Sequence, residues 1–236
     1  MDHFNYCPEL VSLLKNGAQG RSGKMIDRTS LSTNNNLVVL RNLMMERRPQ
    51  NTLEVGMASG GSALVFTATH RDLGRSPVGQ HISIDPFQEQ EAHWDAAGLQ
   101  IVEQAGLTKY MTFHGQSSAI ALASLLRDGH GIDMCYIDGS HLFEDVFVDW
   151  YFLSKLAQDK GVLLFDDATD PHVRKVIRFI QTNMSESFRE LDLQPYRPDK
   201  GGTKYRLGRL LGKTQLRAFE KRGTADRVWN APFSRF

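Results

Sequence analysis

The chain has 236 residues, of which 41% are hydrophobic and 23% charged, as is ordinary for a globular protein with a sizeable core. This composition excludes a largely disordered chain, and the apolar runs are too short to span a bilayer. The formal net charge is +1, but residues 200–236 carry ten Lys or Arg against two acidic residues, which leaves residues 1–199 at −7.

The chain begins with a predicted short helix over Pro8–Lys15, where Pro stands near the first turn. Residues 16–24 are rich in glycine and predict a mobile loop, so that residues 1–34 are expected to form an N-terminal helix and a lid. A second helix is predicted from Ser32 to Arg47, because its apolar residues recur at helical spacing.

From residue 52 onward, strand and helix patterns alternate. This rhythm predicts an α/β fold of the Rossmann-like kind, with a mostly parallel sheet and helices on both faces. We expect one domain over residues 35–210 and a basic C-terminal extension over 211–236. The predicted elements are strand Thr52–Val55, helix Ser62–Leu73, strand His81–Asp85, helix Glu89–Gln104, strand Tyr110–His114, helix Ser117–Arg127, strand Asp133–Ile137, helix Phe143–Ala157, strand Val162–Phe165, helix Pro171–Met184, and a closing antiparallel pair of Phe188–Leu193 with Lys204–Leu207.

The first of these strands runs into a glycine-rich turn that opens a helix, as is typical of a nucleotide-binding site. Gly56 permits a tight bend, and Gly60 with Gly61 removes side chains that would hold a ligand away from the backbone. Free N–H groups at the start of the helix can then face the ligand. The spacing E-x-G-x-x-x-G-G-S differs from the G-x-G-x-x-G of dinucleotide dehydrogenases, so the ligand need not be NAD.

Polar residues follow the next two strands, and ligands of such sheets bind beyond the carboxyl ends of the strands. Asp85 ends the second strand and could accept hydrogen bonds from both hydroxyls of a ribose, although an aspartate before a proline is also a common turn residue. Gln116 could contact an adenine edge, and Ser117 could instead serve only to cap the following helix.

The fourth and fifth strands end in Asp138 and in the pair Asp166 and Asp167. Because adjacent parallel strands lie roughly 5 Å apart, these carboxylates are expected to converge, and a divalent cation such as Mg²⁺ would relieve their repulsion. His141 follows three residues after Asp138 and is a candidate general base. Asp170 before Pro171 predicts the N-cap of a helix.

Together these motifs resemble class I S-adenosylmethionine-dependent methyltransferases, and most closely the small-molecule O-methyltransferases that include macrocin O-methyltransferase-like enzymes. The resemblance covers roughly residues 35–185 and implies a seven-stranded sheet with S-adenosyl-L-methionine as cofactor. It implies His141 and Asp138 as catalytic residues and, in metal-dependent members, Mg²⁺ bound by Asp138, Asp166 and Asp167. The cofactor-binding residues that it implies are Glu54, Gly56, Met57, Ala58, Ser59, Gly60, Ser62, Asp85, Phe87, Gln116, Ser117 and Asp138.

The function that follows is O-methylation of a hydroxyl on a sugar, polyketide or aromatic metabolite, with or without Mg²⁺. One alternative is an NAD-dependent oxidoreductase with a divergent glycine turn, which would leave the clustered aspartates without a role. Another is a non-catalytic methyltransferase-like domain whose basic tail recruits RNA or a protein partner.

Cys7 and Cys135 are far apart, and we interpret both as thiols of a reducing compartment. Residues 1–5 have neither a basic region nor an apolar core typical of a signal peptide, which favours a cytoplasmic enzyme. We expect a small-molecule acceptor and neither a membrane nor a nucleic-acid partner. The apolar residues of the tail and of the N-terminal helices are compatible with both a homodimer and a monomer.

Overall fold

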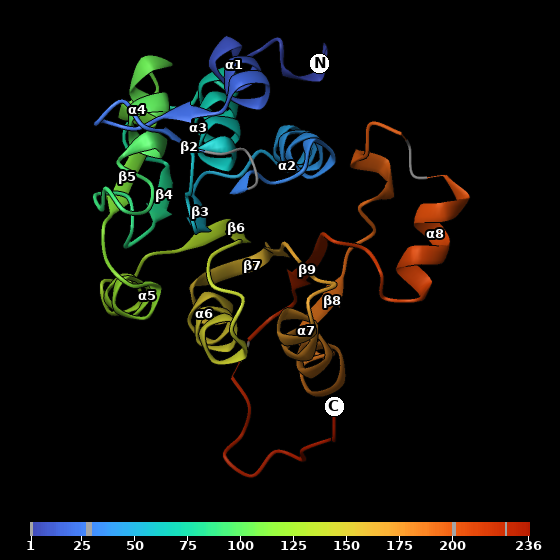
Figure 1. Cartoon of the computed structure of the whole chain (residues 1–236). Helices are drawn as coiled ribbons and strands as arrows, with labels where there is room; N and C mark the ends of the chain where they lie inside the picture. Colours follow the sequence, from blue (N-terminus) through green and yellow to red (C-terminus); the bar gives the residue numbers. More distant parts are fainter. Residues whose placement is uncertain (1, 27–29, 200–201, 225) are drawn as a thin grey trace. The chain divides into compact units, whose positions relative to one another are not determined.

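The computed structural model describes residues 2–26, 30–199, 202–224 and 226–236 (Figure 1). Seven strands form a mostly parallel sheet in the order β5-β4-β3-β6-β7-β9-β8, and a separate two-stranded hairpin lies near the N-terminus. The predicted α/β fold is therefore confirmed. The chain divides into two compact units, Met1–Ser118 with Tyr196–Pro198, and Ala119–Pro195 with Asp199–Phe236.

The first unit contains three parallel strands in the order β5-β4-β3. All residues of β3 and β4 are buried, as expected for strands covered on both faces. Helix α3 is buried from Gly61 to His70 because it contacts α1, α2 and α4. The elements are η1 (Asp2–Phe4), α1 (Pro8–Asn16), β1 (Ala18–Gln19), β2 (Met25–Ile26), α2 (Asn34–Arg47), β3 (Thr52–Val55), α3 (Gly61–Asp72), β4 (His81–Ile84), α4 (Ala97–Gln104), η3 (Thr108–Tyr110) and β5 (Met111–His114).

The second unit contains the parallel pair β6 and β7, followed by β9 and β8, which run antiparallel to their neighbours. Helix α6 packs against α7, and an aromatic cluster of Phe147, Trp150 and Phe179 fills their interface. The elements are α5 (Ser118–Arg127), β6 (Ile132–Ile137), α6 (Phe143–Leu156), β7 (Ala157–Phe165), α7 (Pro171–Asn183), β8 (Phe188–Glu190), η4 (Gln194–Tyr196), α8 (Thr203–Leu210) and β9 (Arg217–Lys221).

Of the two strands predicted to close the sheet, the second, Lys204–Leu207, is wrong. Residues 204–207 lie within helix α8, and the partner of β8 is β9, which also pairs with β7. β9 lies inside the segment expected to be a basic extension, and its first three residues, Arg217, Ala218 and Phe219, are buried. The extension therefore supplies a strand of the sheet.

Two other predictions differ from the structure. The helix expected from Glu89 begins only at Ala97, because Asp95 and Ala96 adopt left-handed backbone angles that interrupt any preceding helix. The loop expected over residues 16–24 contains part of the β1–β2 hairpin, and Asp95 fixes it by accepting hydrogen bonds from the amide and the hydroxyl of Ser22.

Cys7 and Cys135 are both buried and free, as predicted. Burial raises the pKa of the Cys7 thiol to about 11 and raises that of Cys135 as well. In the described part of the chain, no helix has the length and apolar character that crossing a bilayer requires.

Candidate active site

The glycine turn between β3 and α3 is built from alternating left-handed residues. Gly56, Ala58 and Gly60 have φ angles of 90°, 46° and 88°, and the amide of Gly60 donates to the carbonyl of Met57 at 2.9 Å. A Cβ atom on Gly60 would lie 2.7 Å from Cγ2 of Ile101, so α4 leaves no room for a side chain there. The turn thus needs glycine at this position for both its angle and its packing.

Asp85, at the end of β4, holds this turn in place. Its side chain is 3% exposed, and its Oδ2 accepts hydrogen bonds from the amides of Met57 at 3.1 Å and Ala58 at 2.9 Å. Its Oδ1 accepts from the amide of Phe87 at 2.8 Å. Asp85 therefore connects the ends of β3 and β4, and contact with a ribose remains a prediction.

Glu54 lies wholly inside the first unit. Its Oε1 accepts from the hydroxyl of Ser83 at 2.7 Å and lies 3.3 Å from Nε2 of His81. Its Oε2 is buried and has no hydrogen-bond partner among the described residues. The side chain thus braces β3 against β4, and its role toward a cofactor stays a prediction.

The other predicted cofactor residues of the first unit differ in exposure. The side chains of Ser59 and Ser62 are buried, whereas the ring of Phe87 is 44% exposed and stacks at a tilt on His93, with ring centroids 4.7 Å apart. Gln116 is half-buried and Ser117 is exposed after β5. The hydroxyl of Ser117 bonds to no described residue, so the proposed capping of α5 by Ser117 is not observed.

In the second unit, three side chains from two strand ends come together. Donor atoms of Asp138, His141 and Asp167 all lie within 4.8 Å of one another. Nε2 of His141 lies 3.1 Å from Oδ2 of Asp167, and these side chains are 49% and 33% exposed. Asp167 also has a φ of 46°, a left-handed angle that aspartate adopts more readily than most residues with a side chain.

Asp166, predicted to be a metal ligand, lies outside this cluster. Its side chain is 3% exposed, accepts a hydrogen bond from the hydroxyl of Tyr136, and accepts another from the amide of Asp167 at 2.8 Å. Successive residues at the end of a strand point in opposite directions, so Asp166 faces the interior while Asp167 faces the loops. The structure therefore groups His141, instead of Asp166, with Asp138 and Asp167.

Gln215 is part of this site and was missed by the sequence reasoning. Its Nε2 donates to Oδ1 of Asp167 at 3.1 Å, and its carbonyl accepts from the amide of Ala168 at 2.7 Å. Gln215 thereby fixes the loop after β7. It comes 48 residues after Asp167, just before the unpredicted strand β9, and no local pattern marks it.

The cluster can act chemically in two ways. Two carboxylates and an imidazole form a mixed oxygen and nitrogen donor set, which suits Mn²⁺ or Fe²⁺ as well as the more oxygen-selective Mg²⁺. Without a metal, Asp167 can fix the tautomer of His141 and support it as a general base.

Known protein families and solved structures include proteins that are similar to this chain. A family model described as a methyltransferase domain matches residues 53–168, which span the glycine turn, Asp85 and the Asp138–Asp167 cluster. Curated protein sequences contain no match to the chain.

Several solved structures share the fold. The O-methyltransferase TomG from Streptomyces achromogenes, involved in tomaymycin synthesis and solved with S-adenosylmethionine, has a TM-score of 0.60 at 17% identity, over 94% of this chain and 100% of that one. An O-methyltransferase from Bacillus cereus, in complex with SAH, has a TM-score of 0.58 at 17% identity, over 82% and 83%. A putative caffeoyl-CoA O-methyltransferase from Staphylococcus aureus has a TM-score of 0.60 at 12% identity, over 91% and 92%.

The seven-stranded, mostly parallel sheet with its helices is thus the class I methyltransferase fold. Over residues 53–168 the chain matches a methyltransferase domain, and it shares its fold with O-methyltransferases that were solved with SAM or SAH. The family resemblance inferred from the sequence is confirmed, and the oxidoreductase alternative is set aside.

Proposed function

We propose that the protein transfers the methyl group of S-adenosylmethionine to a hydroxyl oxygen of a small molecule, with His141 as the general base. The observation that carries this proposal is the 3.1 Å contact between Nε2 of His141 and Oδ2 of Asp167, half-exposed at the carboxyl ends of β6 and β7. The similar folds of O-methyltransferases such as TomG support the choice of oxygen as acceptor atom.

The first unit is assigned to the cofactor. Its fit rests on the turn, where glycine at 56 removes a side chain that would hold a ligand away from the backbone, and on the exposed ring of Phe87, which offers a face to a base. When bound, the sulfonium of the cofactor supplies an electrophilic methyl group. The residues assigned to it are Gly56–Gly60, Phe87, Gln116 and Ser117, with Glu54, Ser62 and Asp85 in support.

The second unit is assigned to the acceptor. His141 accepts the hydroxyl proton as the oxygen attacks, and the carboxylate of Asp167 stabilises the imidazolium that results. Gln215 donates to the other oxygen of Asp167 and keeps that carboxylate turned toward His141. Asp138 belongs to the same cluster, and we assign to it the orientation of the hydroxyl.

The role of His141 is tested by substitution. His141→Gln is expected to lower kcat by roughly 10²–10⁴-fold, because the proton acceptor is lost, while the Kd for S-adenosylmethionine is unchanged. His130→Gln, an exposed histidine after α5, is the control and is expected to keep full activity. Full activity of His141→Gln would remove the base from the mechanism.

The same cluster could instead bind a metal, and chelation separates the two roles. As a base, His141 must not be a ligand, so activity is expected to survive dialysis against EDTA. Loss of activity that Mn²⁺ or Mg²⁺ restores would contradict this assignment and make Asp138, His141 and Asp167 a metal site.

The remaining inferences concern the cellular location, the kind of substrate and the oligomeric state of the enzyme. We propose a cytoplasmic enzyme that acts on a small metabolite and not on nucleic acid. The oligomeric state, a monomer or a homodimer, is measured by sedimentation equilibrium of the whole chain.

A further inference from the structure

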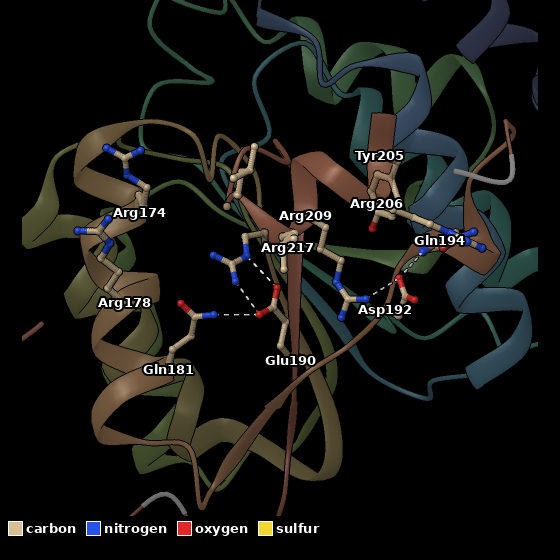
Figure 2. Close-up of a pocket in the computed structure, with 13 residues that line it drawn as sticks. Arg174, Arg178, Gln181, Glu190, Asp192, Gln194, Tyr205, Arg206, Arg209 and Arg217 are labelled. Atoms are coloured by element: carbon tan, nitrogen blue, oxygen red, sulfur yellow. Dashed lines mark hydrogen bonds and ion pairs between the residues drawn. The ribbon is translucent and has the colours of Figure 1, made fainter. Parts of the chain in front are cut away.

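A cavity lies in the same unit as the cluster of Asp138, His141 and Asp167. Residues of α7, β8, β9 and α8 line a cavity of about 810 Å³, a volume that suits a ligand of metabolite size (Figure 2). Five of its lining residues are arginines, and two are acidic, for a formal charge of +3. The charged residues are Arg174, Arg178, Arg206, Arg209, Arg217, Glu190 and Asp192.

Three of the arginines are already held by the protein. Arg217 is 7% exposed and forms a two-pronged ion pair with Glu190, at 2.8 and 2.6 Å. Arg209 pairs with Asp192 at 3.0 Å, and Arg206 donates to Oε1 of Gln194 at 3.1 Å. The charges of Glu190 and Asp192 are thus compensated by arginines. These contacts fix the side chains that form one wall of the cavity.

The remaining two arginines have no such partner in the described part of the chain. Arg174 and Arg178 stand one helical turn apart on α7, followed by Gln181 on the same stripe, and all three line the cavity (Figure 2). Within residues 2–26, 30–199, 202–224 and 226–236, neither guanidinium makes a hydrogen bond or ion pair. These two adjacent guanidinium groups, one half-buried and one exposed, are suited to a phosphate, because two phosphate oxygens together can accept the two parallel hydrogen bonds of one guanidinium.

The cavity also adjoins the catalytic cluster along the chain. Arg217 pairs in register with Phe165, the last residue of β7, and Gln215, two residues earlier, holds Asp167. Helix α7, which carries Arg174, begins at Pro171, directly after the loop that contains Asp167. Two walls of the cavity therefore start within a few residues of the proposed acceptor site.

We propose that this cavity binds a phosphate group of the methyl acceptor, so that the substrate is a phosphate ester or diphosphate of a hydroxylated small molecule. This inference rests on the proposed function. A compact anion fits better than a nucleic acid, because the arginines line a hollow of about 810 Å³, which suits a small ligand and not an extended phosphate backbone.

The binding part is tested by calorimetric titration of the whole chain with sodium pyrophosphate, in the presence of S-adenosylhomocysteine. The double variant Arg174→Gln with Arg178→Gln is expected to weaken pyrophosphate binding by roughly tenfold or more, because hydrogen bonds to two charged groups are lost. The control is Arg189→Gln with Arg222→Gln, which removes the same charge from exposed residues outside the cavity. No saturable binding by the unaltered protein, or equal weakening in both variants, would overturn the site.

The substrate part is tested by methyl transfer to glucose and to glucose 1-phosphate. The phosphate ester is expected to be the better acceptor, and the cavity variant is expected to raise its KM while kcat changes little. Transfer to the neutral compound alone, with no change in the variant, would overturn the link to the acceptor.

If S-adenosylhomocysteine does not bind, the proposed function is refuted. The titration with pyrophosphate then still tests independently whether the cavity binds phosphate. Salt-sensitive RNA binding that the cavity variant abolishes, without pyrophosphate binding, would overturn the small-molecule choice.

Discussion

At the scale of single residues, Asp85 holds the glycine turn in place and is proposed to bind the ribose of the cofactor, and a substitution can separate these two roles. Asp85→Asn replaces one carboxylate oxygen by an N–H₂ group facing backbone donors, and we expect it to lower the free energy of unfolding by about 2 kcal/mol. The Kd for S-adenosylhomocysteine is expected to rise at least roughly tenfold, because the turn loosens. Urea denaturation and calorimetry measure the two effects.

The control for Asp85→Asn is Glu91→Gln, an exposed acidic residue in the following turn, which is expected to change neither quantity. If Asp85→Asn weakened binding with no loss of stability, Asp85 would act on the ribose alone, and its function in shaping the turn would be refuted.

His70 is expected to make the stability of the first unit depend on pH. It is fully buried, its Nε2 lies 2.9 Å from the hydroxyl of Thr52, and burial lowers its pKa to about 3, helped by His81 and Arg75. The unfolded chain binds a proton at His70 below about pH 6.5 and the folded chain does not, so stability falls as the pH drops through this window. Between pH 6.5 and pH 5 this group is expected to cost about 1.5 kcal/mol.

The test compares urea denaturation of the unaltered protein and His70→Gln at both pH values. Gln retains a hydrogen-bonding partner for Thr52 but does not titrate, so the stability difference between the two proteins is expected to shrink by about 1.5 kcal/mol at pH 5. His3→Gln, an exposed histidine, is expected to follow the unaltered protein. Parallel behaviour of His70→Gln and the unaltered protein would contradict this account.

At this scale, the sequence identifies which residues are polar at strand ends but not which way each one faces. Asp166 and Asp167 are indistinguishable as neighbours in the chain, yet one bonds to Tyr136 in the interior and the other to His141. The direction in which each of these two side chains points is set by the pleat of β7 and by the loop that follows it. Gln215 reaches Asp167 only because β9 pairs with β7, which no local pattern indicates.

At the scale of elements, Asp170 fixes the start of α7, the helix that carries Arg174 and Arg178. Its side chain accepts from the amide of His172 at 2.8 Å, and Pro171 follows as the first helical residue, as the sequence predicts. Asp170→Ala is expected to lower the free energy of unfolding by about 1 kcal/mol, while Asp170→Asn, which keeps an oxygen acceptor, is expected to lower it much less. Thermal or urea denaturation measures both, and equal losses would exclude capping as the cause.

Elements with a clear period were predicted well, and those governed by distant contacts were not. β3 matched its predicted bounds because four consecutive buried residues end at a glycine turn. Helix α4 begins late, since left-handed angles at Asp95 and Ala96 follow from the bonds of Asp95 to the β1–β2 hairpin. β9 was missed because its charged residues, Arg217 and Lys221, are paired inside the protein with Glu190 and with the carbonyl of Ala157.

At the scale of the whole molecule, the uneven charge of the chain has a structural explanation in part. Several basic residues of the C-terminal segment belong to the fold: Arg206, Arg209 and Arg217 line the phosphate cavity, and Lys221 is 8% exposed within β9. Burial lowers the pKa of Lys221. The segment therefore need not recruit nucleic acid in order to account for its charge.

The central claim is that the first unit binds the adenosyl cofactor of a methyltransferase, and calorimetric titration with S-adenosylhomocysteine tests it most directly. One saturable site per chain is predicted, with NADH giving no saturable binding to the same protein. Gly60→Val, which would place a branched side chain against Ile101 and Gly98, is predicted to abolish the site. Saturable binding of NADH, without any binding of S-adenosylhomocysteine by the unaltered chain, would contradict the account.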